Sequence, residues 1–465
     1  MRSNRGFDWG LFLRRVAMIA VPVALQNLLT TTGSMVDTMM IASLGQTEVG
    51  AVGLCAQFSS LMFSGYWGFV GGGMLFFAQY WGAKDDDGIN RSYGLTLTCM
   101  MAVGLLFCAL ATLFPATVMR LYTDKASIQS VGVEYLRIVG FSYPLTVLSM
   151  AMSALLRCTN RIKIPLYGSI ASVVTNTFLN WVLIFGHFGL PRLGVRGAAI
   201  ATVIAQIVGV VVVATLARMD GHPYLLAVRK HFRWGGAFIR EYLRKCGPIL
   251  ANEIMIGLGN MIINIVLGRQ PEEAIAALAV FRTLEGMIIG FFAGFSSAAS
   301  VLVGTEVGAG EPEVAYQRAW RLVYLCQGFI GFVCLMLIGL HTPILTLMGM
   351  REESFRIAFG LICVFAPFAF IRMGNWTQND TFRSAGDASY GTILEIVFMW
   401  LLVLPCVWLS GMVAHWPTLA VFACCYIDEP IRYGLMQRHL FRGTWIKPVT
   451  PEGRAAVKKW REARA

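Results

Sequence analysis

Four polar side chains stand out because they interrupt apolar segments of the chain. Asp37 lies in the first such segment. Asn176 and Asn180 lie in the fifth and are four residues apart, so they share one face of a helix. Thr202 lies in the sixth. One carboxylate, two amides and one hydroxyl suit a proton or a hard monovalent cation. Interhelical hydrogen bonds, and a satisfied structural carboxylate at Asp37, are the simpler alternatives.

The second half of the chain carries a different set of ionisable residues in its apolar segments. The set comprises Glu253, Glu285, Arg372 and Glu395. An ionised group at the centre of a membrane-spanning helix costs roughly 2.5–3.5 kcal/mol, so such residues face a bundle interior or a water-filled cavity. We expect this set to bind a cation or a substrate. For Glu285, an ion pair with Arg282 one turn earlier explains the residue equally well.

The composition places these residues in a membrane. Of 465 residues, 56% are hydrophobic and 14% are charged, whereas soluble proteins average about 25% charged residues. A spanning helix takes about 20 apolar residues, and the sequence predicts twelve such segments. Their approximate cores are residues 14–40, 51–80, 93–116, 134–156, 166–187, 196–217, 246–267, 274–304, 318–340, 356–380, 391–411 and 414–436.

An internal repeat relates the two halves of the chain. Three pairs of residues carry it, namely Pro22 and Pro248, Gly82 and Gly308, and Arg157 and Arg383. Subtracting 22 from 248 gives 226, and the other two pairs give the same difference. The fold class is therefore an all-α polytopic membrane protein with two homologous six-helix lobes. Each proline lies near the start of its helix and frees a carbonyl group, so Pro22 and Pro248 are predicted hinges.

The predicted organisation has four parts. They are an N-terminal lobe at 1–217, a cytoplasmic linker at 218–245, a C-terminal lobe at 246–440 and a basic cytoplasmic tail at 441–465. The second part of the linker, 234–245, is predicted either as a short amphipathic surface helix or as a solvated connector. The end of the tail is predicted to be partly disordered.

The net charge of +12 reflects topology. Of 38 Lys and Arg residues, 28 lie in alternate loops that begin with the N-terminus, including Arg2 and Arg5, and seven lie in the opposite loops. The other three, Arg137, Arg282 and Arg372, lie within helices. This bias predicts that both termini are cytoplasmic, and it gives no reason to expect a nucleic-acid partner.

The remaining chemistry argues against an enzyme. The six histidines are scattered among loops and helix ends without metal-ligand spacing, and no nucleophile is paired with a base. The eleven cysteines lie in or beside apolar segments, so we expect them to act as small hydrophobic residues rather than in disulfides. The first apolar run is too long for a removable signal peptide and is predicted to be the first spanning helix.

An ordered series of motifs resembles the multidrug and toxic compound extrusion (MATE) family, in its bacterial branch. The series covers residues 12 to 445 and comprises Pro22-Val-Ala-Leu-Gln, Val36-Asp37-Thr38, Gly82-Ala83-Lys84, Leu156-Arg157, Asn176 to Gly186, Leu193 to Ala199, Val303 to Gly310 and Phe382 to Asp387. Each motif is moderately specific, whereas their order along the chain is highly specific.

The resemblance implies twelve helices in two lobes around a V-shaped central cavity, and cation-coupled export of amphiphilic drugs. It implies that Asp37 takes part in coupling, with Asn176, Asn180 and Thr202 completing the site in some members. Asn180 stands where part of the family has an acid, which weakens the case for a tightly held sodium ion. Glu253 is similar to an acid that many bacterial members carry on helix seven, although its spacing from Pro248 differs by about a turn within the family.

The sequence therefore predicts an antiporter that exchanges a proton or sodium ion for amphiphilic, cationic drugs by alternating access. A monovalent cation is expected at Asp37 or Glu253, without any cofactor. The expected setting is the lipid bilayer of the bacterial inner membrane, with the chain a multi-pass monomer. One alternative is a flippase for lipid-linked oligosaccharides, which would need a cluster of intramembrane Arg and Lys. A channel, which would conduct without coupling, is another.

Overall fold

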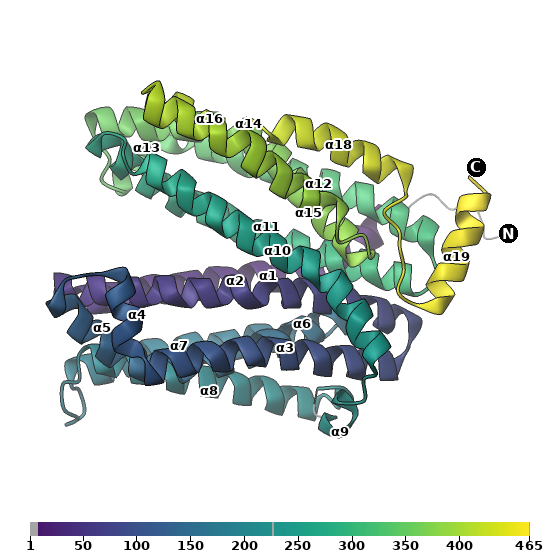
Figure 1. Cartoon of the computed structure of the whole chain (residues 1–465), viewed down its shortest axis with the longest axis horizontal. Coiled ribbons are helices and arrows are strands. Elements are labelled where there is room, and N and C mark those ends of the chain that lie inside the picture. The colour runs from purple at the N-terminus through teal and green to yellow at the C-terminus, as the bar shows by residue number, and fades with distance from the viewer. Residues whose placement is uncertain (1–7, 226, 465) are drawn as a thin grey trace. The chain divides into compact units, whose positions relative to one another are not determined.

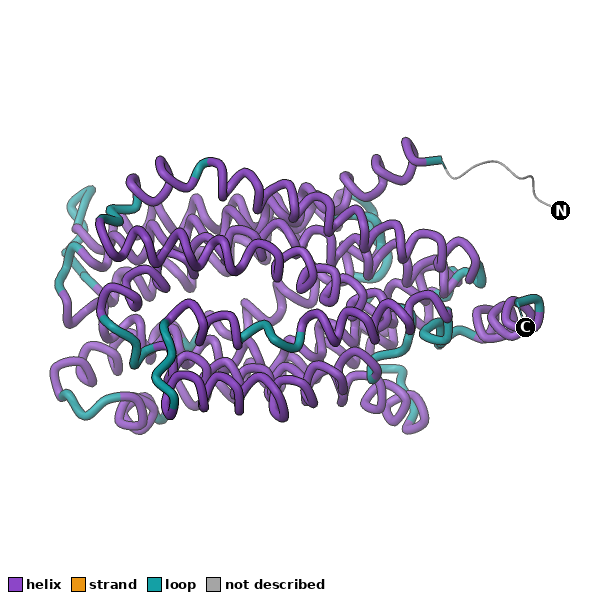
Figure 2. Tube along the Cα trace, turned by 90° about the horizontal axis from the view of Figure 1, so that it is seen from above, coloured by secondary structure: helices purple, strands orange, loops and turns teal. Residues whose placement is uncertain are grey.

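The computed structural model describes residues 8–225 and 227–464. Arg2 and Arg5, which contribute to the predicted cytoplasmic charge, lie outside the described residues. The described part of the chain forms helices joined by turns and loops, and it contains no strand (Figure 2). The predicted all-α membrane fold is therefore confirmed.

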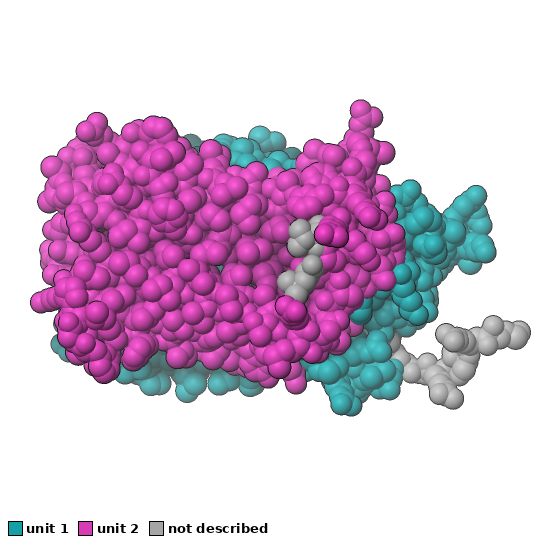
Figure 3. Space-filling view, turned by 90° about the horizontal axis from the view of Figure 1, so that it is seen from below, with its two compact units in different colours: residues 1–20, 78–84, 244–465 teal, residues 21–77, 85–243 magenta. Residues whose placement is uncertain are grey.

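Contacts divide the chain into two compact units (Figure 3). Unit 1 comprises residues 1–20, 78–84 and 244–465, and unit 2 comprises 21–77 and 85–243. This division differs from the lobes proposed from sequence at 1–20 and 78–84. Residues 9–20 and 78–83 are ends of helices from the first half, and their contacts group them with the second half.

Figure 1 labels most of the helices, numbered in chain order. Unit 2 holds most of α1 (Trp9–Ala42) and α2 (Gln46–Ala83), then α3 (Asp86–Leu113), α4 (Pro115–Tyr122), α5 (Ala126–Val139), α6 (Ser142–Cys158), α7 (Lys163–Phe185), α8 (Val195–Met219) and α9 (Val228–His231). Unit 1 holds most of α10 (Gly236–Leu267), then α11 (Glu272–Gly308), α12 (Pro312–Gly339), α13 (His341–Leu347), α14 (Glu352–Ser384), α15 (Tyr390–Phe398), α16 (Leu404–Trp408), α17 (Thr418–Cys424), α18 (Glu429–Arg442) and α19 (Pro451–Glu462).

The apolar segments form the long helices. In the described ranges, ten helices are long and apolar enough to span a membrane, and α5 with α6, bent by 48°, makes an eleventh span. The segment predicted at 414–436 consists instead of α17 and α18, which a turn separates. Each of these two helices is too short to span a membrane alone.

The predicted span at 391–411 contains two π-helical turns. They are η1 (Met399–Val403) and η2 (Leu409–Val413), on either side of α16. The Leu404 amide bonds to the Met399 carbonyl, five residues back. Pro405 follows and has no amide hydrogen, so it cannot continue the α-helical bonding pattern.

Two details of the predicted connections are wrong. Residues 236–245 are the first turns of α10 rather than a separate surface helix. The tail is folded, because Thr450 caps α19 by accepting a bond from the Gly453 amide at 3.3 Å. Trp445, Ile446 and Val457 are buried in the core of unit 1, where they pack with residues of α11, α12 and α14.

Candidate cation sites

Unit 2 brings the four sequence-predicted residues together from three helices. Asn180 donates to Asp37 Oδ1 at 2.6 Å and to Asn176 Oδ1 at 3.2 Å. Asn176 donates to Thr202 Oγ1 at 3.4 Å, and Thr202 donates to the Ala198 carbonyl at 3.0 Å. A continuous chain of hydrogen bonds therefore links α1, α7 and α8 and ends on the Asp37 carboxylate.

Glycines allow α7 and α8 to approach closely enough for these bonds. Gly168 of α7 lies against Gly209 and Val213 of α8, and a Cβ on Gly168 would collide with the Val213 side chain. Gly197 lies against the backbone of Leu183 in the same way. Small residues permit this spacing between membrane helices.

One oxygen in this cluster is not used in a hydrogen bond. Asn180 is fully buried, and its Oδ1 atom accepts no bond from the part of the chain that the structure describes. A buried carbonyl oxygen without a donor is unfavourable, so it is available to a proton or to a hard cation beside Asp37. Tyr135 of α5, which sequence reasoning missed, is also buried here. It interacts with Thr202 and with the charge of Asp37.

Unit 1 contains a group of three charges around α10 and α14, which we call the Arg383 group. Arg383 Nη1 lies 3.6 Å from Glu253 Oε1 and 3.9 Å from Asp380 Oδ1. Ser296 of α11 donates to the second oxygen of Asp380. Two carboxylates therefore share one guanidinium, and the group has one surplus negative charge when both are ionised.

A longer series of ion pairs, which we call the Arg432 group, crosses the same unit. Arg432 is 5% exposed and contacts Glu395, Asp428 and Glu429, with the closest oxygen on Glu429 at 2.8 Å. The full group adds Arg372, Glu285 and Arg282, which continue the series from Glu429. Four carboxylates, on Glu285, Glu395, Asp428 and Glu429, meet three guanidinium groups. This group also has one surplus carboxylate.

The sequence-predicted Glu395 receives its remaining bonds from amides. Asn252 of α10 donates to Glu395 Oε2 at 3.1 Å, and Asn379 of α14 donates to the same oxygen at 3.2 Å. Asn252 directly precedes Glu253 in α10, so its bond to Glu395 brings the Arg383 and Arg432 groups, and both predicted acids, near each other.

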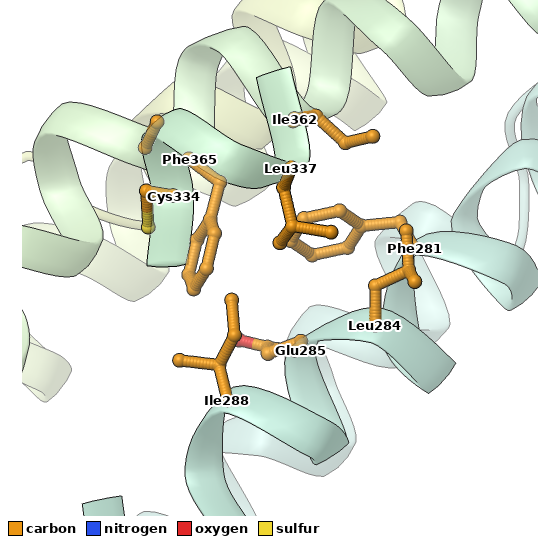
Figure 4. Close-up of a pocket in the computed structure, with 9 residues that line it drawn as sticks. Phe281, Leu284, Glu285, Ile288, Cys334, Leu337, Ile362 and Phe365 are labelled. Carbon is orange, nitrogen blue, oxygen red and sulfur yellow. The ribbon is translucent and has the colours of Figure 1, made fainter. Parts of the chain in front are cut away.

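Glu285 has a different setting from the other acids. Its oxygens contact Arg282 at 2.7 Å, Arg372 at 3.4 Å and the Tyr426 hydroxyl at 3.4 Å. Figure 4 shows it at one side of a small apolar pocket, facing Phe281 and Phe365. Two arginines neutralise the one carboxylate of Glu285, so we assign Glu285 to a structural ion pair. Arg372, also predicted from sequence, joins this pair to Glu429 at 3.7 Å.

Four members of these groups were not predicted as site residues. Asp380 and Arg383 lie at the C-terminal end of α14, and Asp428 and Glu429 lie at the start of α18. Asp428 and Glu429 are buried against Arg432, and Asp380 pairs with Arg383. The sequence signal for them is an excess of acids over arginines on neighbouring helices, which predicts that several carboxylates share one guanidinium group.

The repeat places the same contacts in both units. Gln26 donates to Ser169 Oγ at 2.8 Å in unit 2, and Asn252 donates to Glu395 at 3.1 Å in unit 1. Adding 226 to 26 and to 169 gives 252 and 395. The acceptor of the bond differs between the halves, because the neutral hydroxyl of Ser169 stands where the second half has the carboxylate of Glu395.

The predicted hinges lie inside continuous helices. Pro22 is within α1 and Pro248 is within α10. The unit boundaries fall at 20/21 and 243/244, close to both prolines. Among the described residues, no group of three or more His, Cys, Asp and Glu side chains has the geometry of a metal site.

Comparison with known proteins agrees with this architecture. The family model described as MatE matches residues 22–182 and again 248–409. The two matches begin 226 residues apart, which is the offset of the internal repeat.

Among curated relatives, the probable multidrug resistance protein YoeA of Bacillus subtilis is 26% identical over 413 residues, or 88% of each chain. The probable multidrug resistance protein NorM of Thermotoga maritima is 22% identical over 449 residues, or 93% of each chain.

Solved structures show the same fold. A crystal structure of MATE in complex with MaL6 has a TM-score of 0.83 at 14% identity and covers 92% of this chain and 96% of that one. The Vibrio cholerae MATE transporter VcmN in the bent form also has a TM-score of 0.83, at 17% identity, with 93% and 97% coverage. With its two matched repeats and helical fold, the chain belongs to the MATE family of multidrug efflux transporters.

Proposed function

We propose that this transporter is an antiporter that exchanges a proton or sodium ion for amphiphilic, cationic drugs. The observation that carries the proposal is the surplus of carboxylates over guanidinium groups. The Arg383 group and the Arg432 group each have one surplus carboxylate, and Asp37 accepts a bond from the neutral Asn180 and pairs with no cation among the described residues. Each of these three places gains stability from one added positive charge, because an uncompensated buried charge is costly.

Discharge of Asp37 would rearrange the bonds between helices. Asn180 now donates to the Asp37 carboxylate, and its own Oδ1 has no partner in residues 8–225 and 227–464. A proton on Asp37 would make that residue a donor, so the Asn180 amide would turn its oxygen toward Asp37. A sodium ion would use the same two oxygens. Either event changes the bonds that link α1 to α7 and α8, and so biases the states that these helices can adopt.

The neighbourhood of Pro22 and Pro248 supports their role as hinges. Each interrupts the backbone bonding of a long helix, and each lies near the point where its helix passes from one unit to the other. Movement of α1 beyond Pro22 would couple the protonation or cation binding of Asp37 to the rest of unit 2. Movement of α10 beyond Pro248 would do the same for Glu253 in unit 1.

The substrate class follows from charge and from the relatives. YoeA and NorM are named multidrug resistance proteins, and a surplus of buried negative charge favours cationic amphiphiles. A flippase for lipid-linked sugars is less well supported, because all the arginines of the Arg383 and Arg432 groups already contact carboxylates. The bacterial relatives support a setting in the bacterial inner membrane, and the bias of Lys and Arg supports cytoplasmic termini.

Competition between cation and substrate tests the proposal. A cationic dye added to purified protein in weakly buffered detergent should release protons, or displace bound radioactive sodium, because antiport requires the two ligands to exclude each other. The release should be absent from a double variant that carries Asp37→Asn and Glu253→Gln. A wild-type protein that binds the dye without releasing either cation would contradict the proposal.

A further inference from the structure

Arg157 and Arg383 hold equivalent places in the repeat but have different partners. Both lie in the last turn of their helices, α6 and α14. Arg383 faces two carboxylates, on Glu253 and Asp380. Arg157 instead donates from Nη2 to the amide oxygen of Gln26 at 2.7 Å. In the described part of the chain, no carboxylate lies within ion-pair distance of Arg157.

The helix dipole does not explain this difference. A cation in the last turn of a helix is stabilised by the carbonyl groups there. The effect is common to Arg157 and Arg383, and Arg383 nevertheless has two acids beside it. The first half of the repeat therefore lacks a counter-charge that the second half supplies from its own side chains.

The donors around Arg157 are incompletely used. The Nε atom of Arg157 is buried and has no hydrogen-bond partner among the described residues. Ser169 Oγ accepts from Gln26 at 2.8 Å, which leaves its own hydroxyl hydrogen free to donate. Gln26 therefore lies between the guanidinium of Arg157 and the hydroxyl of Ser169 and bonds to both. Both donors are fixed through the same amide, and a guanidinium N–H and a hydroxyl are donors that a carboxylate accepts from.

We propose that Arg157, Gln26 and Ser169 form a binding site for the carboxylate of a zwitterionic amphiphile. This inference rests on the proposed export of amphiphiles and extends its substrate class. The ammonium group of such a molecule is the part that the proposed export of cationic amphiphiles already requires, whereas its carboxylate supplies the counter-charge that Arg157 lacks. A substrate with both groups is therefore bound more tightly than its ester, which keeps the ammonium group alone.

A matched pair of fluorescent probes tests the site. Nε-dansyl-lysine carries an ammonium and a carboxylate group, and its methyl ester carries the ammonium group alone. Equilibrium binding of each probe is measured with the purified full chain in lipid nanodiscs, in chloride and in gluconate buffer. Arg157→Gln should weaken binding of the acid about tenfold or more, the effect expected for loss of a charge-assisted pair, and change that of the ester less than twofold.

Three further variants separate binding from folding. Arg157→Lys keeps the charge but loses the fork, so it should give an intermediate loss for the acid. Ser169→Ala should weaken binding of the acid by a smaller factor. Arg218→Gln, which removes an exposed charge at the end of α8, should change neither probe. Should Arg157→Gln fail to fold, Ser169→Ala and the preference of the wild-type protein for the acid still decide the question.

Each outcome bears on the site. An equal loss of acid and ester in Arg157→Gln would show a structural role and overturn the inference, as would unchanged binding of both. Chloride that competes with the acid supports an anion site that takes the substrate carboxylate. If chloride stabilises the protein but the acid binds no more tightly than its ester, the site binds an inorganic anion and the inference is overturned. Failure of both probes to bind the wild-type protein counts against the proposed function as well, whereas loss of discrimination counts against this site alone.

Discussion

Gly82 of α2 and Gly308 of α11 pack against each other's helix through backbone atoms. A Cβ on Gly82 would collide with the Thr305 carbonyl, and a Cβ on Gly308 would collide with the backbone of Gln79. Gly82 and Gly308 are 226 residues apart, and so are Gln79 and Thr305. The contact is therefore the same in both directions, and the repeat has kept both glycines because neither position has room for a side chain.

Replacing either glycine should destabilise unit 1. Gly308→Val would force α2 and α11 apart, and overpacking of this kind costs roughly 1–3 kcal/mol. The variant should have a lower melting temperature in detergent, measured by the loss of a monodisperse chromatographic peak on heating.

Gly328→Ala is the matched control. Gly328 lies inside α12, and a Cβ there would meet nothing within 4 Å. Alanine at such a position stabilises a helix by about 0.5–1 kcal/mol. A Gly308→Val variant as stable as the Gly328→Ala variant would show that the close crossing is not required.

Asp37→Asn should abolish drug export while the protein still folds. The asparagine keeps the volume of the side chain and can still bond to Asn180, but it cannot gain or lose charge. Resistance of cells that express the variant should fall to the level of cells without the transporter. Asp124→Asn, at an exposed position between α4 and α5, should leave resistance unchanged. Wild-type resistance with Asp37→Asn at normal expression would exclude this carboxylate from coupling.

Glu253→Gln and Glu395→Gln should change coupling more than stability. Each removes one acid from a group that has a surplus, so Arg383 keeps Asp380, and Arg432 keeps its two other acids. We expect each variant to move fewer cations for each substrate molecule, as measured by paired tracer fluxes in proteoliposomes.

Glu285→Gln should have the opposite effect. Glu285 is 4% exposed and compensates both Arg282 and Arg372. Removing one member of a buried ion pair costs about 3–5 kcal/mol. The melting temperature should therefore fall, whereas the number of cations moved for each substrate molecule should not change. A stable Glu285→Gln variant with altered coupling would reverse the assignment of these acids.

The setting of His222 predicts that the folded protein becomes less stable in mild acid. It follows α8, contacts Thr159 Oγ1 at 2.8 Å and accepts a bond from the Leu225 amide at 3.3 Å. Burial, with a smaller effect of the nearby Arg161, lowers the pKa of His222 from 6.5 to about 4. The unfolded chain therefore takes up a proton at a higher pH than the folded chain does. The contribution to stability is present above pH 6.5 and is lost as the pH falls toward 4.

His222→Gln tests this dependence. Glutamine can preserve a bond to Thr159 but does not titrate. The melting temperature of the wild-type protein should fall more steeply between pH 6.5 and pH 4 than that of the variant. Parallel curves would show that His222 does not control the acid sensitivity.

The long helices could be predicted because a span needs only length and apolar composition. Residues 163–185 and 195–219 illustrate this, since their apolar runs become α7 and α8. The tail could not be predicted in the same way. Helix α19 is polar, and its order depends on Val457 and Trp460 packing against distant residues of unit 1.

The N-terminal candidate site could be largely predicted, because Asn176 and Asn180 are one helical turn apart. Tyr135 could not, since a single tyrosine in an apolar helix gives no sign of its neighbours. The ion pairs of unit 1 were partly missed for a related reason. Arg432 meets Glu395 from a different helix, and sequence spacing does not show which helices adjoin.

Flux under separately imposed gradients tests the central claim most directly. Purified protein is placed in proteoliposomes, and movement of a cationic dye is followed under a proton gradient, under a sodium gradient and with neither. At least one gradient is expected to drive the dye in the opposite direction to the cation, and this response should be abolished by Asp37→Asn and weakened by Glu253→Gln. Equal dye movement under all three conditions would contradict cation coupling.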